Sequence, residues 1–138
     1  YVALERLESI YKTSLYVDNI CVFANSLLTQ PVAVVCPNRK AVERWAEDNG
    51  VSADGVFASN EQVERLKHEI MRSFDQIAKN NGLARFETMY DIVLDEDEWT
   101  PENGCLTAAN KLRRKDIESR HQDIINDIYT RASDNNQR

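Results

Sequence analysis

The strongest constraint on the fold is a pair of short apolar runs in the first third of the chain. Val17 to Ala24 and Val32 to Cys36 are rich in branched residues, which favour extended backbone. The polar stretch between them, residues 25–31, ends in a proline and can form a loop between paired strands. We therefore expect these two runs to form the centre of a β-sheet.

The rest of the chain alternates between helical and extended patterns. Apolar residues recur every three or four positions in four segments, and they alternate with other residues in a third expected strand. Asn49-Gly50 and Asn80-Asn81-Gly82 are typical helix C-terminal signals. This mixture predicts an α+β fold, a small three-stranded sheet covered by helices. The expected helices are Leu4 to Lys12, Ala41 to Asn49, Val63 to Asn80 and Lys115 to Arg131, and the third strand is Met89 to Asp95.

Composition excludes some classes of protein. The sequence is 42% apolar and 29% charged, and it has no apolar run as long as a membrane helix requires. Its formal net charge of −6 argues against a general nucleic-acid binder, because such affinity depends mostly on neutralising phosphates. The chain lacks an initiating methionine and the features of a signal peptide, so we expect a fragment of a longer, cytoplasmic protein.

The cysteine, histidine and acidic residues suggest no metal site. Three cysteines, Cys21, Cys36 and Cys105, form no C-x-x-C pair, which favours reduced, buried thiols. Asp95 to Glu98 has some likeness to a calcium loop, but Trp99 and Thr100 stand where that loop needs an oxygen ligand and a glycine. His68 and His121 show no neighbouring nucleophile and carboxylate, and we expect them to be surface or edge residues.

A candidate functional lysine lies late in the chain. Asn103-Gly104 predicts a tight turn, Cys105 to Thr107 can be a short strand, and a small-residue loop then leads to Lys111. A lysine on such a loop can place its charge beside a phosphate or a carboxylate. The alternative from the residues alone is a solvated lysine at the head of the basic cluster Lys111, Arg113, Arg114 and Lys115.

The stretch from Glu102 to Arg114, ENGCLTAANKLRR, resembles the last signature segment of the acyl-adenylate-forming enzymes, in the version found in long-chain fatty acyl-CoA synthetases. The start of the chain, YVALERLE, resembles the segment that follows the interdomain hinge of the same family. The segments SLYVDNICVFANS and VAVVCPN are similar to the strands after it. These motifs occur in one order over nearly the whole chain.

The resemblance implies that residues 1–133 are the small C-terminal lid domain of an AMP-binding enzyme. From its position at the end of the chain, we expect residues 134–138 to be a disordered tail. In that family, a large N-terminal domain of the same polypeptide holds ATP, Mg²⁺ and the fatty acid. The enzyme joins the carboxylate to AMP, and the thiol of coenzyme A then attacks the acyl-adenylate. The chain would be inactive by itself, and any membrane association would involve other regions of the protein.

The family pattern assigns two sets of site residues. Lys111 corresponds to the adenylation lysine, and Tyr1, Val2 and Ala3 correspond to residues that line the pantetheine tunnel. Many relatives carry Pro-Thr-x before the lysine, whereas this chain has Ala108-Ala109-Asn110; Asn110 can still adopt the left-handed conformation that glycine provides elsewhere. Two alternatives stay open: a non-catalytic interaction domain of the same fold, and a binder of nucleic acid or anionic surfaces through residues 111–115, which the overall acidity disfavours.

Overall fold

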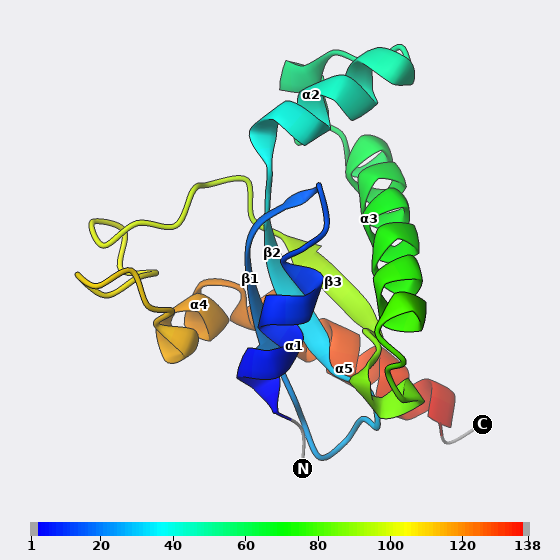
Figure 1. The fold of residues 1–138 in the computed structure, drawn as a ribbon, viewed down its shortest axis with the longest axis vertical. Coiled ribbons are helices and arrows are strands. Elements are labelled where there is room, and N and C mark those ends of the chain that lie inside the picture. The colour runs from blue at the N-terminus through cyan, green and yellow to red at the C-terminus, as the bar shows by residue number, and fades with distance from the viewer. Residues whose placement is uncertain (1–2, 137–138) are drawn as a thin grey trace.

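The computed structural model describes residues 3–136, and Figure 1 shows an α+β architecture around a single sheet. The predicted fold class is confirmed. In chain order the elements are α1 (Leu4–Tyr11), β1 (Val17–Phe23), β2 (Val32–Pro37), α2 (Arg39–Asp48), the 3-10 turn η1 (Ala53–Gly55), α3 (Asn60–Asn80), the 3-10 turn η2 (Arg85–Glu87), β3 (Asp91–Leu94), α4 (Arg114–Arg120) and α5 (Gln122–Asn136).

The sheet is mixed, with the order β1-β2-β3. β1 pairs antiparallel with β2, as the two apolar runs predicted, and a bulge lies between Val17 and Asn19. β3 joins the other edge of β2 in parallel, after the chain has crossed back through α2 and α3. A parallel neighbour requires such a crossover, and here the long helix supplies it.

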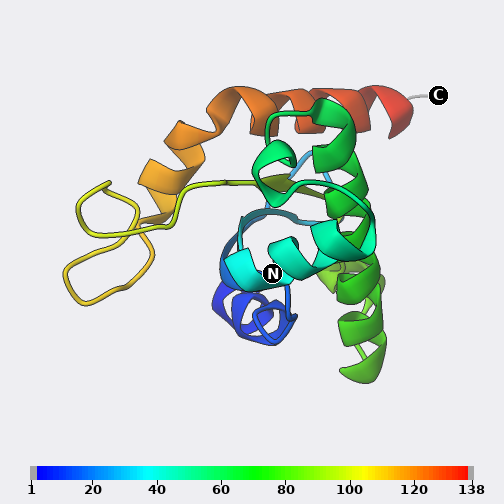
Figure 2. The same cartoon turned by 90° about the horizontal axis from the view of Figure 1, so that it is seen from above.

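Both faces of the sheet are covered. Figure 2 shows α1 and α5 on opposite sides of the strands. Successive strand residues therefore enter different cores, which explains why the strands are nearly continuous apolar runs. One core joins Ile20, Val22, Ala33, Val35 and Ile92 to α1, α2 and α3. The other joins Cys21, Phe23, Val32, Val34 and Val93 to α4, α5 and the loop after β3.

Local signals account for the ends of the helices. The Asn38 side chain accepts a hydrogen bond from the Ala41 amide at the start of α2, and Ser59 does the same for Gln62 at the start of α3. Gly50 and Gly82 follow the C-caps of these helices with φ of 66° and 62°, conformations that glycine adopts without strain. Among the helices of the described residues, none is both long and apolar enough to cross a bilayer.

Three local predictions were wrong. The single helix expected from Lys115 to Arg131 is two helices separated at His121, and α5 continues to Asn136. Where a strand was expected, at Cys105 to Thr107, the structure has only an isolated β-bridge between Leu106 and Leu112, and this bridge is not extended by further strand pairing among the described residues. The third strand is shorter than predicted. Its two central residues, Ile92 and Val93, are both buried although they point to opposite faces of the sheet.

Candidate functional site

Lys111 belongs to the long segment between β3 and α4, and this segment extends away from the sheet in Figures 1 and 2. Within this segment, residues 105–113 fold back on themselves. The Arg113 amide donates to the Cys105 carbonyl at 2.9 Å. The Leu106–Leu112 bridge lies one residue closer to the turn formed by residues 107–111. The predicted loop position of Lys111 is therefore confirmed.

A tight turn presents the lysine. The Thr107 amide donates to the Lys111 carbonyl at 2.8 Å, and the Thr107 hydroxyl accepts from the Lys111 amide at 3.1 Å. Asn110, just before the lysine, has φ of 61°, so it adopts the left-handed conformation that the sequence allowed it. The backbone of Lys111 is thus constrained by hydrogen bonds while its side chain is exposed.

The acidic side chains described in the structure leave the Lys111 ammonium group free to bind an anion. Within residues 3–136, no carboxylate forms an ion pair with Lys111. Two other members of the basic cluster are engaged: Arg113 pairs with Asp116 at 3.0 Å, and Arg114 pairs with Glu8. Lys111 therefore offers a positive charge that no internal ion pair neutralises.

A groove of about 470 Å³ lies beside the lysine, between α1 and the turn. Lys12 and Lys111 line it together with Glu5, and the Glu8–Arg114 pair also lies along it. Its charges are of both signs, and no glycine-rich loop contributes backbone donors. The groove thus lacks the features of a complete nucleotide site.

The C-terminal end of the segment between β3 and α4 is held in place by Arg114, the first residue of α4. Its guanidinium donates to both oxygens of Glu8, at 2.8 and 3.1 Å, and to the Val22 carbonyl at 2.7 Å. Glu8 also accepts from the Val22 amide at 2.7 Å. These charged hydrogen bonds to Glu8 raise the pKa of Arg114, so its guanidinium stays positively charged.

The N-terminal end of the segment between β3 and α4 is held in place by Asp95, which directly follows β3. Its Oδ2 lies 2.9 Å from the Trp99 indole nitrogen, 2.9 Å from the Arg120 Nε and 2.8 Å from the His121 Nε2. Burial by itself raises the pKa of Asp95. The hydrogen bonds from His121, Trp99 and Arg120 outweigh burial and hold the pKa well below its usual range.

These two anchors were not predicted from the sequence. Glu8 and Arg114 are separated by 106 positions, and Asp95 and Arg120 by 25, so no local pattern links them. His121 was predicted to be a surface or edge residue, and it is partly buried beside Asp95. Asp95, which the sequence placed at the end of the third strand and in an unsuitable calcium loop, is the centre of this cluster.

The predicted pantetheine-tunnel residues are only partly visible. Tyr1 and Val2 lie outside the described residues, and Ala3 is an exposed residue immediately before α1. Cys21, Cys36 and Cys105 are buried and unpaired, as expected for reduced thiols. Within the described part of the chain, no group of three or more His, Cys, Asp and Glu residues could hold a metal ion.

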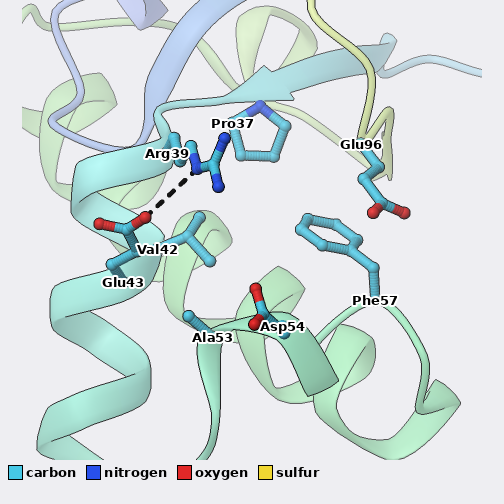
Figure 3. Close-up of a pocket in the computed structure, with 8 residues that line it drawn as sticks. All are labelled: Pro37, Arg39, Val42, Glu43, Ala53, Asp54, Phe57 and Glu96. Atoms are coloured by element: carbon cyan, nitrogen blue, oxygen red, sulfur yellow. Dashed lines mark hydrogen bonds and ion pairs between the residues drawn. The ribbon is translucent and has the colours of Figure 1, made fainter.

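A second pocket, of about 250 Å³, lies between α2, η1 and the beginning of the loop after β3 (Figure 3). Phe57 and Val42 give it an apolar wall, while the carboxylates of Glu43, Asp54 and Glu96 border it. Its one guanidinium, from Arg39, lies 3.2 Å from Glu43. An acidic border disfavours phosphate, so this pocket is not a candidate for the nucleotide.

Comparison with known proteins gives a consistent set of relatives, although no protein-family model matches the chain. The chain is 38% identical over 135 residues to long-chain-fatty-acid–CoA ligase 4 of Saccharomyces cerevisiae, covering 94% of this chain and 19% of that protein. It is 38% identical over 129 residues to long chain acyl-CoA synthetase 8 of Arabidopsis thaliana, covering 94% of this chain and 18% of that protein. The chain thus spans about a fifth of the length of these relatives.

Solved structures with a similar fold are adenylation domains. The adenylation and carrier didomain of carboxylic acid reductase from Segniliparus rugosus, in complex with AMP, superposes with a TM-score of 0.78 at 28% identity, covering 96% of this chain and 16% of that one. The adenylation domain of the carboxylate reductase from Mycobacterium chelonae gives 0.77 at 29% identity, covering 94% and 18%. In both sequence and structure, the chain corresponds to a small part of a larger protein.

Proposed function

We propose that this chain, which is homologous to the C-terminal region of the AMP-binding enzymes, is the lid domain of a long-chain fatty acid–CoA ligase. The full-length enzyme would activate a fatty acid with ATP to the acyl-adenylate and then transfer the acyl group to coenzyme A. Sequence similarity to long-chain fatty acid–CoA ligases over 94% of the chain supports this proposal. The same similarity disfavours a purely non-catalytic role.

The observation that carries the proposal is the state of Lys111, a fixed backbone position with an exposed ammonium that has no internal partner among residues 3–136. A carboxylate that attacks the α-phosphate of ATP brings two anions together, and negative charge accumulates as pyrophosphate leaves. A cation at that position offsets the repulsion and holds the nucleophile in line. We assign this role to Lys111.

ATP, Mg²⁺ and the fatty acid would be bound mainly by the N-terminal adenylation domain of the same polypeptide. Mg²⁺, when bound, shields the charge of the phosphates. The residues described here offer no ligand set for it, and their contribution is the positive charge of Lys111. In the second half-reaction, Tyr1, Val2 and Ala3 would line the path of the pantetheine arm.

The first experiment tests Lys111 in the full-length enzyme. Lys111→Ala is expected to lower the rate of acyl-adenylate formation about 100-fold to 1,000-fold, as the loss of one electrostatic contact to a transition state does. The rate of thioester formation from supplied acyl-adenylate should stay within about twofold, because that step no longer involves ATP. Single-turnover assays with labelled ATP and fatty acid measure the first rate.

The matched control is Lys115→Ala, which removes an exposed lysine from the same basic cluster. This variant should keep both rates within about twofold of the unmodified enzyme. Equal loss of both half-reactions in Lys111→Ala, or equal effects of the two substitutions on adenylation, would contradict the assigned role.

A further inference from the structure

Both ends of helix α4 form ion pairs with buried carboxylates from other parts of the fold. Arg114, its first residue, pairs with Glu8 of α1, and Arg120, its last residue, pairs with Asp95 at the end of β3. The side chains of Glu8 and Asp95 are only 10% and 4% exposed. A seven-residue helix held at two points by ion pairs has little freedom to shift or rotate.

The contact at the N-terminal end has the more demanding geometry. Two nitrogens of Arg114 meet two oxygens of Glu8, and one of them also donates to the Val22 carbonyl. The Val22 amide in turn donates to Glu8. A lysine has the same charge but cannot reproduce a planar, two-pronged contact, so this site depends on the guanidinium itself.

Lys111 stands three positions before Arg114, on the strand-like limb that runs directly into α4. The Cys105–Arg113 hydrogen bond and the Leu106–Leu112 bridge couple this limb to the other one. A displacement of Arg114 would therefore move the turn that presents Lys111. Buried ion pairs often add little net stability compared with apolar replacements, while they do define one geometry.

We infer that Arg114, held by Glu8, is a positioning residue that sets where the Lys111 ammonium is delivered during adenylation. This inference rests on the proposed function. In this role Arg114 does not contact the substrate and acts only by positioning Lys111. A displacement of about 1 Å at a reacting centre can lower a rate by about 100-fold, so loss of this anchor should appear in the adenylation rate.

The test uses the full-length enzyme and Arg114→Lys, which keeps the charge and removes the two-pronged contact. Adenylation kcat is expected to fall about 10-fold to 100-fold, with the KM for ATP changed by less than about threefold, because ATP is bound elsewhere. The thioester step from supplied acyl-adenylate should stay within about twofold. Arg72→Lys is the matched control, since Arg72 makes an exposed two-nitrogen contact with Glu69 on α3.

A double substitution separates positioning from a general structural effect. In the Lys111→Ala background, Arg114→Lys should cause no further loss of adenylation, because the group it positions is gone. An undiminished loss in that background would overturn the inference, as would equal loss in both half-reactions. If Arg114→Lys does not yield folded enzyme, Glu8→Gln replaces it, since it keeps an acceptor for the Val22 amide and removes the charge.

The two proposals fail in different ways. Full adenylation activity in Lys111→Ala would contradict the proposed function of the chain. Loss of adenylation in Lys111→Ala together with unchanged adenylation in Arg114→Lys and in Glu8→Gln would contradict only the positioning role.

Discussion

At the scale of single residues, the basic cluster before and within α4 divides into groups with different roles. Arg113 forms a surface pair with Asp116, and Arg114 is bound to Glu8 and Val22. Lys111 has no such partner in the described structure, and its backbone is constrained by Thr107. Three basic residues that look equivalent in the sequence, Lys111, Arg113 and Arg114, therefore have distinct surroundings in the folded chain.

Asn110 provides the first prediction at this scale. Its φ of 61° is accessible to asparagine and glycine but is strained for a β-branched residue, at a cost of about 1–2 kcal/mol. Asn110→Gly should therefore preserve adenylation in the full-length enzyme, while Asn110→Val should slow it by disturbing the turn before Lys111. Single-turnover adenylation assays check this, and equal rates in the two variants would contradict the importance of the turn.

Asp95 provides the second prediction. Asp95→Asn should lower the free energy of unfolding of this chain by about 1–3 kcal/mol at pH 7, because it weakens a buried group of hydrogen bonds. Denaturant unfolding measures the loss. The matched control is Asp127→Asn, since the Asp127 carboxylate forms only an exposed pair with Arg131.

The effect of Asp95 should also depend on pH. Because the folded-state pKa of Asp95 is lowered, the stability it contributes is complete above the pKa of an unfolded-state aspartate and is lost as pH falls through the folded value. The difference between the unmodified chain and Asp95→Asn should be constant from pH 7 to about pH 5 and shrink below about pH 4. A difference that grew on acidification would contradict this sign.

At the scale of elements, α3 is the helix whose structure follows most directly from its sequence. Its buried residues, Leu66, Ile70, Phe74 and Ala78, repeat every four positions, and the first three pack in the core with the sheet and α1. The rings of Phe74 and Tyr11 lie 4.8 Å apart between their centroids. Burial also raises the pKa of Tyr11 to about 12, so this tyrosine stays neutral at physiological pH.

Ile70→Ala is the prediction for this element. Ile70 is fully buried, and removing its side chain should lower the free energy of unfolding by about 2–5 kcal/mol, from lost burial and the cavity left behind. Urea unfolding of the chain measures this change. Lys79→Ala on the exposed surface of the same helix should change stability by less than about 0.5 kcal/mol.

The separation of α4 from α5 has a tertiary cause. The apolar spacing from Ile117 to Ile128 suits one continuous helix, and Ile117, Ile125 and Ile128 are all buried. The backbone of His121 departs from helical geometry, and its side chain lies against Asp95. Ile124, whose spacing from Ile117 and Ile128 would put it on the same face of one continuous helix, is 51% exposed.

At the scale of the whole molecule, the sheet separates two cores, and the three cysteines belong to the core under α4 and α5. Burial raises the pKa of Cys21 to about 12 and that of Cys36 to about 11, and it raises the pKa of Cys105 as well. Buried, protonated thiols are poor nucleophiles. The native molecule therefore protects all three from reaction.

The corresponding prediction concerns thiol labelling of the chain. If the core under α4 and α5 opens as one unit, Cys21, Cys36 and Cys105 should react with an aromatic disulfide at one common, opening-limited rate. Mass spectrometry of labelled peptides distinguishes the sites. Faster labelling of Cys105 alone would show that the Lys111 loop opens separately from the sheet, and it would contradict a single cooperative unit.

The sequence by itself located most of the elements and the loop that carries Lys111. Helix periodicity, branched apolar runs and Asn-Gly signals are local, so they located three strands, the first three helices and the Lys111 loop without knowledge of the fold. The order of the signature segments was equally visible along the chain. Lys111 itself stood out only through the resemblance, because an exposed lysine has no distinguishing local pattern.

Tertiary structure alone decided which charges meet. The Glu8–Arg114 and Asp95–Arg120 pairs join residues from elements that are distant in sequence, and the parallel placement of β3 beside β2 brings the Asp95 end of the loop into position. The same packing breaks the last helix at His121 and leaves Lys111 without an internal partner in the described structure. These features depend on the three-dimensional arrangement of the layers, which no local pattern encodes.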